Sequence, residues 1–202
     1  IPIVKEILQN MNIKILEAPS YEADDVIGTV VQKLKNNPNL DIIIVTGDLD
    51  TLQLIDSNVK VWTLKTGISQ SFVYDYEAFV KKYGMEPSQF VDYKGLKGDP
   101  SDNIPGIEGI GDKTAKELIN KHHTIEELLK DAKKIIDDPL VLNKDKKIYK
   151  KILEYKDEAL FSKQLASISL DVPIEFTLDD MLYQIHNIDA LKESLKKYGF
   201  YS

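Results

Sequence analysis

The stretch Asp41-Ile-Ile-Ile-Val-Thr-Gly-Asp48-Leu-Asp50 decides the fold class of this chain. Its four consecutive β-prone residues, 42–45, predict a strand that is buried on both faces, and the following Thr-Gly pair predicts a turn. Asp48 and Asp50 come next, at the carboxyl end of the strand, where open α/β sheets bind their ligands. Residues two apart in extended chain point the same way, so these carboxylates can converge on one cation. The alternative interpretation is a solvated acidic turn.

Two further acidic clusters favour a cation-binding site over a solvated turn. Glu22, Asp24 and Asp25 lie at the start of a helix, where acidic residues also suit the positive end of the helix dipole. Capping explains one such residue, but three of them within four positions exceed what a cap requires. Asp99 and Asp102 form the last pair, and their alternative role is that of turn and capping residues.

A glycine-rich segment, residues 104–111, directly follows the last acidic pair and opens into a helix predicted from Asp112. Its glycines permit a tight hairpin whose amides point outward at a helix N-terminus, which suits a phosphate, or a monovalent cation held by loop carbonyls. A helix–hairpin–helix of this kind binds the phosphate backbone of a duplex and makes no sequence-specific contacts with the bases. The alternative is a simple turn. The predicted DNA-binding residues are Gly106, Gly109, Gly111, Lys113, Thr114 and Lys116.

The composition is that of an ordinary globular protein without a membrane segment. The chain has 202 residues, of which 43% are hydrophobic and 29% charged, and it has no cysteine, which excludes disulfides and thiolate metal sites. The net charge of −7 argues against a nucleic-acid partner, but the seven carboxylates named above would face bound cations. All 26 basic residues are lysine, so phosphate contacts would come from point charges and backbone N–H groups.

Periodicity divides the chain near residue 75. Before this point strands alternate with helices, which predicts a mostly parallel α/β sheet flanked by helices. After it the pattern is helical, and the basic run 144–151 is either a solvated helix face or a track for a phosphate backbone. The predicted strands are 13–17, 42–45, 59–64 and 71–74, with a hairpin turn at 65–67.

Together these motifs resemble the 5′ nuclease family. The motifs are Tyr21-Glu-Ala-Asp-Asp25, Thr46-Gly-Asp-Leu-Asp50 and Gly98-Asp-Pro-Ser-Asp-Asn103, the last followed by the glycine hairpin. The family includes the 5′→3′ exonuclease domain of bacterial DNA polymerase I, phage 5′ nucleases and flap endonucleases. The resemblance implies a PIN-like α/β nuclease core, of which residues 1–75 would be the carboxyl-terminal part, and a helical lobe, residues 76–202, that carries a helix-3-turn-helix DNA-binding motif.

The same resemblance implies a metal-dependent hydrolysis of DNA phosphodiesters in replication and repair. Two Mg²⁺ or Mn²⁺ ions would be needed, and a K⁺ ion at the hairpin. The implied partners are flap, nicked or 5′-ended duplex DNA and an RNA primer. The resemblance further implies a cytoplasmic, nucleoid-associated bacterial monomer that is fused to a DNA polymerase. The implied metal ligands are Glu22, Asp24 and Asp25 at the first position and Asp48, Asp50, Asp99 and Asp102 at the second, with Asp25, Asp48 and Asp50 as catalytic residues.

The chain departs from the family pattern at its start. Family members begin with a strand that carries a further Asp ligand, followed by a helical arch, and neither precedes Ile1. Leu49 also stands where relatives often carry Lys. We therefore expect this polypeptide alone to be weakly active or inactive. The alternative function is a non-catalytic, structure-selective DNA-binding module, and a PIN-like ribonuclease ranks last because it would lack the hairpin.

Overall fold

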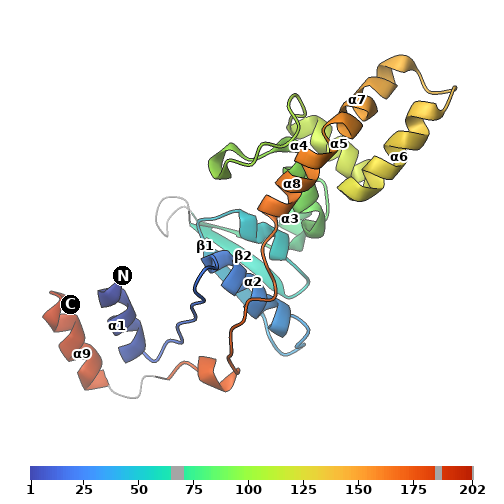
Figure 1. Cartoon of the computed structure of the whole chain (residues 1–202). Helices are drawn as coiled ribbons and strands as arrows, with labels where there is room; N and C mark the ends of the chain where they lie inside the picture. The colour runs from blue at the N-terminus through green and yellow to red at the C-terminus, as the bar shows by residue number, and fades with distance from the viewer. Residues whose placement is uncertain (65–70, 185–187, 202) are drawn as a thin grey trace. The chain divides into compact units, whose positions relative to one another are not determined.

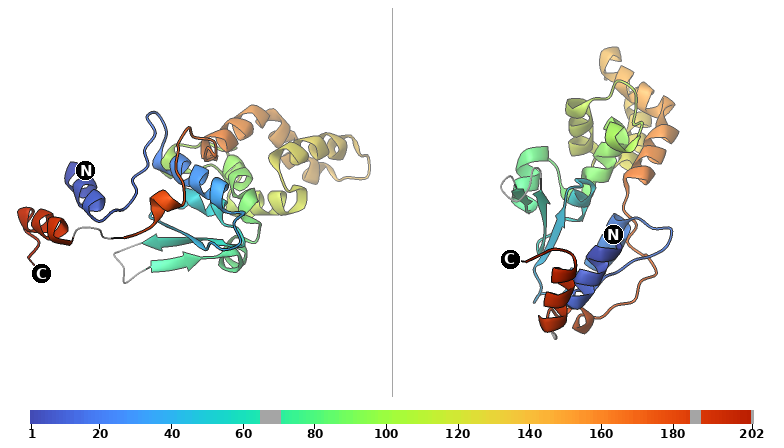
Figure 2. Two further views of the ribbon diagram at one scale, coloured as in Figure 1. Left: turned by 90° about the horizontal axis from the view of Figure 1, so that it is seen from below. Right: turned by 90° about the vertical axis from the view of Figure 1, so that its left-hand side faces the viewer.

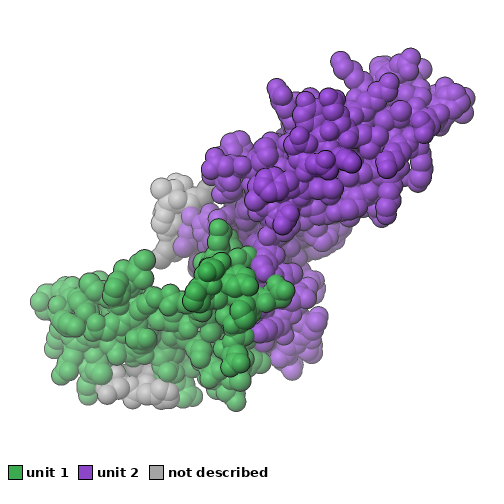
Figure 3. Space-filling model, in the orientation of Figure 1, with its two compact units in different colours: residues 1–26, 171–202 green, residues 27–170 purple. Residues whose placement is uncertain are grey.

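The chain folds into two compact units. The structure is a computed structural model that describes residues 1–64, 71–184 and 188–201. Unit 1 combines the two ends of the chain, residues 1–26 and 171–202, and unit 2 contains residues 27–170 (Figure 3). Among the described helices, none combines the length and the apolar character that crossing a bilayer requires. The predicted division at residue 75 follows a change in sequence pattern and stays a prediction.

Unit 1 pairs the first and last helices of the chain. Helix α1 (Pro2–Asn10) contacts α9 (Ile188–Lys197), and the two lie side by side in Figure 2. The Glu6 carboxylate accepts hydrogen bonds from Lys197 Nζ at 3.2 Å and from the Tyr198 hydroxyl at 2.6 Å. The strand predicted at residues 13–17 is wrong, because this segment pairs with no strand in the described chain and is irregular.

A three-stranded sheet forms one side of unit 2. Strand β1 (Ile42–Thr46) pairs in parallel with β2 (Val59–Leu64), which pairs antiparallel with β3 (Ser71–Tyr74) (Figure 1). The prediction that β1 is buried on both faces is wrong. Side chains alternate between the faces of a strand, so Ile44 is buried whereas Ile43 and Val45 are 55% and 54% exposed. The predicted turn at 65–67 lies outside the described residues.

Helices make up the rest of unit 2, and local capping sets where they begin and end. The Asp75 carboxylate accepts the Ala78 N–H at the start of α3, and Gly84 ends that helix in the left-handed conformation at φ 71°. The Thr124 hydroxyl caps α6 by accepting the Glu127 N–H. The helices are α2 (Ala23–Leu34, which begins in unit 1), α3 (Tyr76–Tyr83), α4 (Phe90–Lys97), α5 (Asp112–His122), α6 (Ile125–Asp137), α7 (Asn143–Glu154) and α8 (Lys156–Ala166).

The core of unit 2 centres on α4, which packs closely against α8. Gly95 makes this approach possible, because a Cβ at that position would stand 3.0 Å from Lys163 Cβ and 3.1 Å from the Ala159 carbonyl oxygen of α8. The buried Asp92 carboxylate ties three helices together. It accepts the Ile125 N–H at 2.8 Å and pairs with Lys163 Nζ of α8 at 2.7 Å. This network ties α4 to α6 and α8, and the carboxyl end of α4 borders the site described next.

Candidate metal centre and nucleic-acid interface

Three carboxylates converge at the carboxyl ends of β1 and α4. Asp50 begins the short 3-10 helix η1 (Asp50–Leu54) that follows β1. Asp99 is the N-cap and Asp102 the last residue of the 3-10 turn η4 (Pro100–Asp102), which follows α4. One carboxylate oxygen from each of the three residues lies within 4.8 Å of the other two. Oxygen donors at this spacing are the ligands that hard divalent cations prefer, so the residues present fit a divalent metal ion.

Lys94, on the inner face of α4, lies between two of these carboxylates. Its side chain is only 6% exposed, and its ammonium group pairs with Asp50 and, at 2.9 Å, with Asp99. In a site without a metal ion, this ammonium supplies the positive charge that keeps two neighbouring acidic groups from repelling each other. The sequence patterns did not single out Lys94. The available signal was a lysine among the buried residues Phe90, Tyr93 and Leu96.

The two carboxylates that contact Lys94 differ in their electrostatics. Burial raises the pKa of Asp50, with smaller upward contributions from the charges of Asp48 and Asp102, and Lys94 offsets only part of the increase. Burial also acts to raise the pKa of Asp99, but hydrogen bonds from Ser101 and Lys94 outweigh it and lower that pKa to about 2. Asp99 is therefore the firmly charged member of the group at neutral pH.

Asp48 lies beside the three converging carboxylates without joining them. Its side chain accepts the Asp50 N–H at 2.9 Å, and its own N–H donates to Thr46 Oγ1 at 3.0 Å. These bonds form a tight turn directly after β1 and place Asp48 on the surface. The charge of Asp48 nevertheless acts on Asp50. A role for Asp48 as a metal ligand stays a prediction.

The first acidic cluster lies at the start of α2. The Asp25 carboxylate accepts the Glu22 N–H at 3.1 Å, which is one half of a capping box, and Asp24 lies in the same first turn. Capping therefore accounts for Asp25. These three residues belong to unit 1 and the acids around Asp50 belong to unit 2, so their convergence on one catalytic site stays a prediction.

The predicted glycine hairpin follows the acidic turn directly. Asp99 and Ile104 exchange two backbone hydrogen bonds of 2.9 Å each, which close the acidic turn before the glycines begin. Gly109 has a positive φ of 77°, and Gly111 is the N-cap of α5. The carboxylates and the N-terminus of α5 are therefore connected by one short, internally bonded segment.

Gly106 has a different role from the one predicted. Its N–H donates to the Oγ of buried Ser162 at 2.9 Å, so the expectation that this amide points outward is wrong. A Cβ at Gly106 would stand 2.2 Å from the Gly98 nitrogen, which shows that two backbone segments touch at this point. Contact between the hairpin and DNA through Gly109 and Gly111, both exposed, stays a prediction.

The three predicted DNA-binding residues of α5 lie in its first turns. Lys113 is exposed, and Thr114 is partly buried. Lys116 pairs with Asp112 at 3.0 Å, and its ammonium lies 5.9 Å from the centre of the Tyr93 ring. Lys113 also has a carboxylate partner, Glu117, but at 4.0 Å and with a side chain that is 90% exposed, so its ammonium is held less closely than that of Lys116.

Comparison with known proteins places this chain in a family. The model described as "5′-3′ exonuclease, N-terminal resolvase-like domain" matches residues 1–84, and the model described as "5′-3′ exonuclease, C-terminal SAM fold" matches residues 85–190. The chain belongs to the 5′-3′ exonuclease family. The predicted fold class is confirmed.

Individual relatives agree with the family. DNA polymerase I from Caldicellulosiruptor bescii is 42% identical over 204 residues, which cover all of this chain and 23% of that protein. The chain thus spans about a quarter of this relative. Among solved structures, the catalytic core of Rad2 in complex with a DNA substrate aligns with a TM-score of 0.65 and 19% identity, over 99% of this chain and 64% of Rad2. The T5 5′-exonuclease with bound zinc aligns with a TM-score of 0.59 and 19% identity, over 88% of this chain and 58% of that one.

Proposed function

We propose that the chain is part of a divalent-metal-dependent 5′→3′ exonuclease and flap endonuclease that hydrolyses DNA phosphodiesters in replication and repair. One observation carries the proposal: three carboxylates converge, and two of them, Asp99 and Asp102, lie in the short turn that leads into the hairpin at the start of α5. A metal site and a backbone-gripping hairpin so close together suit a reaction at a phosphate near the end of a held duplex.

Within this proposal, Asp50, Asp99 and Asp102 hold a Mg²⁺ or Mn²⁺ ion at the second metal position, with Asp48 at its edge. Glu22, Asp24 and Asp25 serve the first position. Divalent ions held by these carboxylates would supply activation of a water molecule and stabilisation of the leaving oxygen of the phosphodiester. Lys94 orients the carboxylates of Asp50 and Asp99 toward each other, and the hydrogen bonds from Ser101 fix Asp99. Asp25, Asp48 and Asp50 are the proposed catalytic residues.

The proposed DNA interface is the hairpin and the start of α5. Its amides and the positive end of the helix dipole favour a phosphate, and Lys113 adds a mobile charge. A K⁺ ion at the hairpin carbonyls would add to this attraction. Flap, nicked or 5′-ended duplex DNA and RNA primers are the proposed substrates. The residues concerned are Gly109, Gly111, Lys113, Thr114 and Lys116, whereas the buried Gly106 supports the hairpin from within.

The wider context of the proposal rests on the family. We propose a cytoplasmic, nucleoid-associated bacterial monomer that is joined to a DNA polymerase, because the curated relatives are bacterial DNA polymerases I of about four times this length. Residues 1–75 would supply the nuclease core and residues 76–202 the DNA-binding lobe.

Metal titration tests the proposal directly. Isothermal calorimetry should show Mn²⁺ binding to the 202-residue chain, and Asp99→Asn should weaken it about tenfold or more, because a hard cation depends on the charge of its ligands. Asp48→Asn should show a similar loss. Asp138→Asn, at a turn between α6 and α7, is the matched control and should bind as the wild type does. Unchanged Mn²⁺ affinity in Asp99→Asn would contradict the proposed metal site.

A second candidate function is a DNA-binding module without catalysis. The observation that favours it is the ammonium group of Lys94, which already neutralises Asp50 and Asp99. A single-turnover assay with excess protein and a labelled 5′-flap duplex separates the two functions. Mg²⁺-dependent cleavage that Asp99→Asn abolishes supports the nuclease. Duplex binding with neither cleavage nor Mn²⁺ affinity supports the module.

A further inference from the structure

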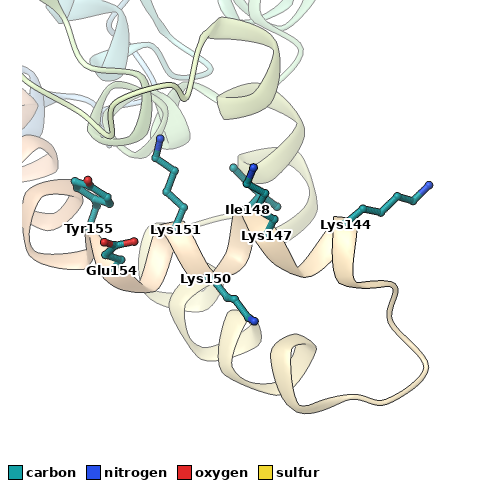
Figure 4. Close-up of a pocket in the computed structure, with 7 residues that line it drawn as sticks. All are labelled: Lys144, Lys147, Ile148, Lys150, Lys151, Glu154 and Tyr155. Atoms are coloured by element: carbon teal, nitrogen blue, oxygen red, sulfur yellow. The ribbon is translucent and has the colours of Figure 1, made fainter.

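Helix α7 carries a cluster of lysines that neither the metal centre nor the hairpin accounts for. Lys144, Lys147, Lys150 and Lys151 line a surface hollow together with Ile148, Glu154 and Tyr155 (Figure 4). In Figure 4 the side chains of Lys147 and Lys151 point to one side of α7, and Lys150 points to the other. Among the side chains that the structure describes, four positive groups and one negative group line the hollow.

Packing explains why these lysines face solvent. Tyr149 and Ile152, 7% and 0% exposed, bury the opposite side of α7 in the core of unit 2. Lys144, Lys147 and Lys151 have the spacing i, i+3 and i+7, so they form a stripe about 10 Å long on one side of the helix. Over that length one DNA strand carries roughly three phosphates, at 3.4 Å of helix axis each.

The lysines of this stripe also differ from other lysines of unit 2 in their partners. Lys94 and Lys163 each pair with two carboxylates. Among the side chains that the structure describes, no carboxylate forms an ion pair with Lys144, Lys147 or Lys151. Like charges three and four positions apart on a helix repel each other, and a bound polyanion would relieve this repulsion.

Lys151 connects the stripe to the glycine hairpin. A Cβ at Gly109 would stand 3.0 Å from Lys151 Nζ, so this ammonium lies directly against the hairpin backbone. The same ammonium lies 5.8 Å from the centre of the Tyr155 ring, which helps to hold it there. The stripe therefore begins at the proposed phosphate site of the hairpin and continues along α7 toward Lys144.

We propose that Lys144, Lys147 and Lys151 form a second phosphate-binding stripe, which holds the backbone of the same duplex DNA that the hairpin holds. The proposal rests on the proposed function. The ammonium groups act as point charges on consecutive phosphates, and they contribute affinity without sequence preference. Lys150, on the other side of α7, does not belong to the stripe.

Salt-dependent binding tests the stripe separately from the metal centre. The variant Lys144→Gln/Lys147→Gln/Lys151→Gln keeps good helix formers while it removes three charges. Fluorescence anisotropy would measure its affinity for a labelled 5′-flap duplex in EDTA between 50 and 200 mM NaCl. We expect the slope of log K against log salt to become shallower by about 2 to 3, and the Kd to rise about tenfold or more at 100 mM.

A matched variant controls for net charge. Lys81→Gln/Lys130→Gln/Lys133→Gln removes three exposed lysines from α3 and α6, and it should change the slope by less than about one. Circular dichroism melting should show both variants folded.

The outcomes separate the two proposals. If the wild type binds duplex DNA and both triple variants show the same Kd and the same salt slope, the proposed role of the stripe is overturned while the proposed function stands. If the wild type binds no duplex at 50 mM salt, both fail. If polyglutamate competes as well as duplex DNA for the stripe, the surface serves an acidic peptide, and the DNA proposal is overturned.

Discussion

The ammonium group of Lys94 takes the position of a cation between Asp50 and Asp99 in a protein whose other features indicate a metal site. A buried lysine is costly to desolvate, and burial acts to lower its pKa. Hydrogen bonds to Asp50 and Asp99 outweigh this and raise the pKa of Lys94, so it stays charged. The charged states of Lys94, Asp50 and Asp99 therefore stabilise one another.

Replacing Lys94 by Met should show this dependence. In EDTA we expect the variant to lose about 2–3 kcal/mol of unfolding free energy, because two partly buried carboxylates lose their counterion. Mn²⁺ should restore more stability to the variant than to the wild type. Urea unfolding followed by circular dichroism, with and without Mn²⁺, measures both effects.

The control is Lys97→Met, which removes an exposed lysine from the same helix and should change stability by less than about 0.5 kcal/mol. Equal losses in the two variants would contradict the role given to Lys94.

The lowered pKa of Asp99 predicts the direction in which the stability of the chain changes with pH. Its pKa falls to about 2 in the folded chain. Its charge therefore contributes stability that is fully present above about pH 4, the ordinary aspartate range, and is lost as the pH falls toward 2. At pH 6 the free energy of unfolding of the wild type should exceed that of Asp99→Asn by up to about 2 kcal/mol. This difference should disappear as the pH falls toward 2.

Urea denaturation across that range measures the gap. The control is Asp157→Asn, at an exposed position of α8. Its free energy of unfolding should differ from that of the wild type by less than about 0.5 kcal/mol at pH 6. A gap between wild type and Asp99→Asn that widens as the pH falls would refute the assigned sign.

At the scale of elements, the acidic turn and the hairpin form one substructure through backbone contact. Ile107 N–H donates to Leu96 O at 2.8 Å, so the hairpin returns to the end of α4. Gly98 and Gly106 meet there, with positive φ values of 77° and 62°. A side chain at either position would separate the acids from the hairpin.

Two glycine substitutions test this arrangement. Gly106→Ala should lower the free energy of unfolding by about 3 kcal/mol or more, because its Cβ would stand 2.2 Å from Gly98 N and its φ is positive. Gly111→Ala should cost less than about 1 kcal/mol, since its φ is −90° and nothing lies within 4 Å of the added Cβ. Chemical denaturation compares the two. Similar costs would show that the contact with Gly98 is unimportant.

At the scale of the whole molecule, the two units differ in how much they bury. None of the described residues of α1 is buried, and in α9 only Ser194 is. In α4, by contrast, six of eight residues are buried. Local opening is easiest where few side chains are buried, so unit 1 should open independently of the core of unit 2.

Hydrogen exchange measures this difference. Amides of α1 and α9 should exchange at least about 100-fold faster than those of α4, which should exchange only on global unfolding. Helix α5, in the same unit as α4, is the internal control and should resemble it. Uniform protection across α1 and α4 would mean that the chain unfolds as one cooperative body.

The sequence by itself determined the elements and the location of the acidic turn. The strand predicted at 59–64 and the helix predicted from Asp112 are confirmed, because these signals act over a few residues through local backbone sterics and hydrogen bonds. The acids of the 98–103 motif precede the hairpin as predicted. Local rules could not show that residues 13–17 find no pairing strand in the described chain, because pairing depends on distant segments.

Only the tertiary structure decided which groups surround the acids. Asp50 and Lys94 are 44 positions apart, and their contact exists because the core of unit 2 fixes α4 beside the end of β1. The same packing turned the amide of Gly106 inward to Ser162 and placed Lys151 against Gly109. Side-chain identity specifies what a residue can bind, but burial and long-range packing determine which partner it meets and hence how it is charged.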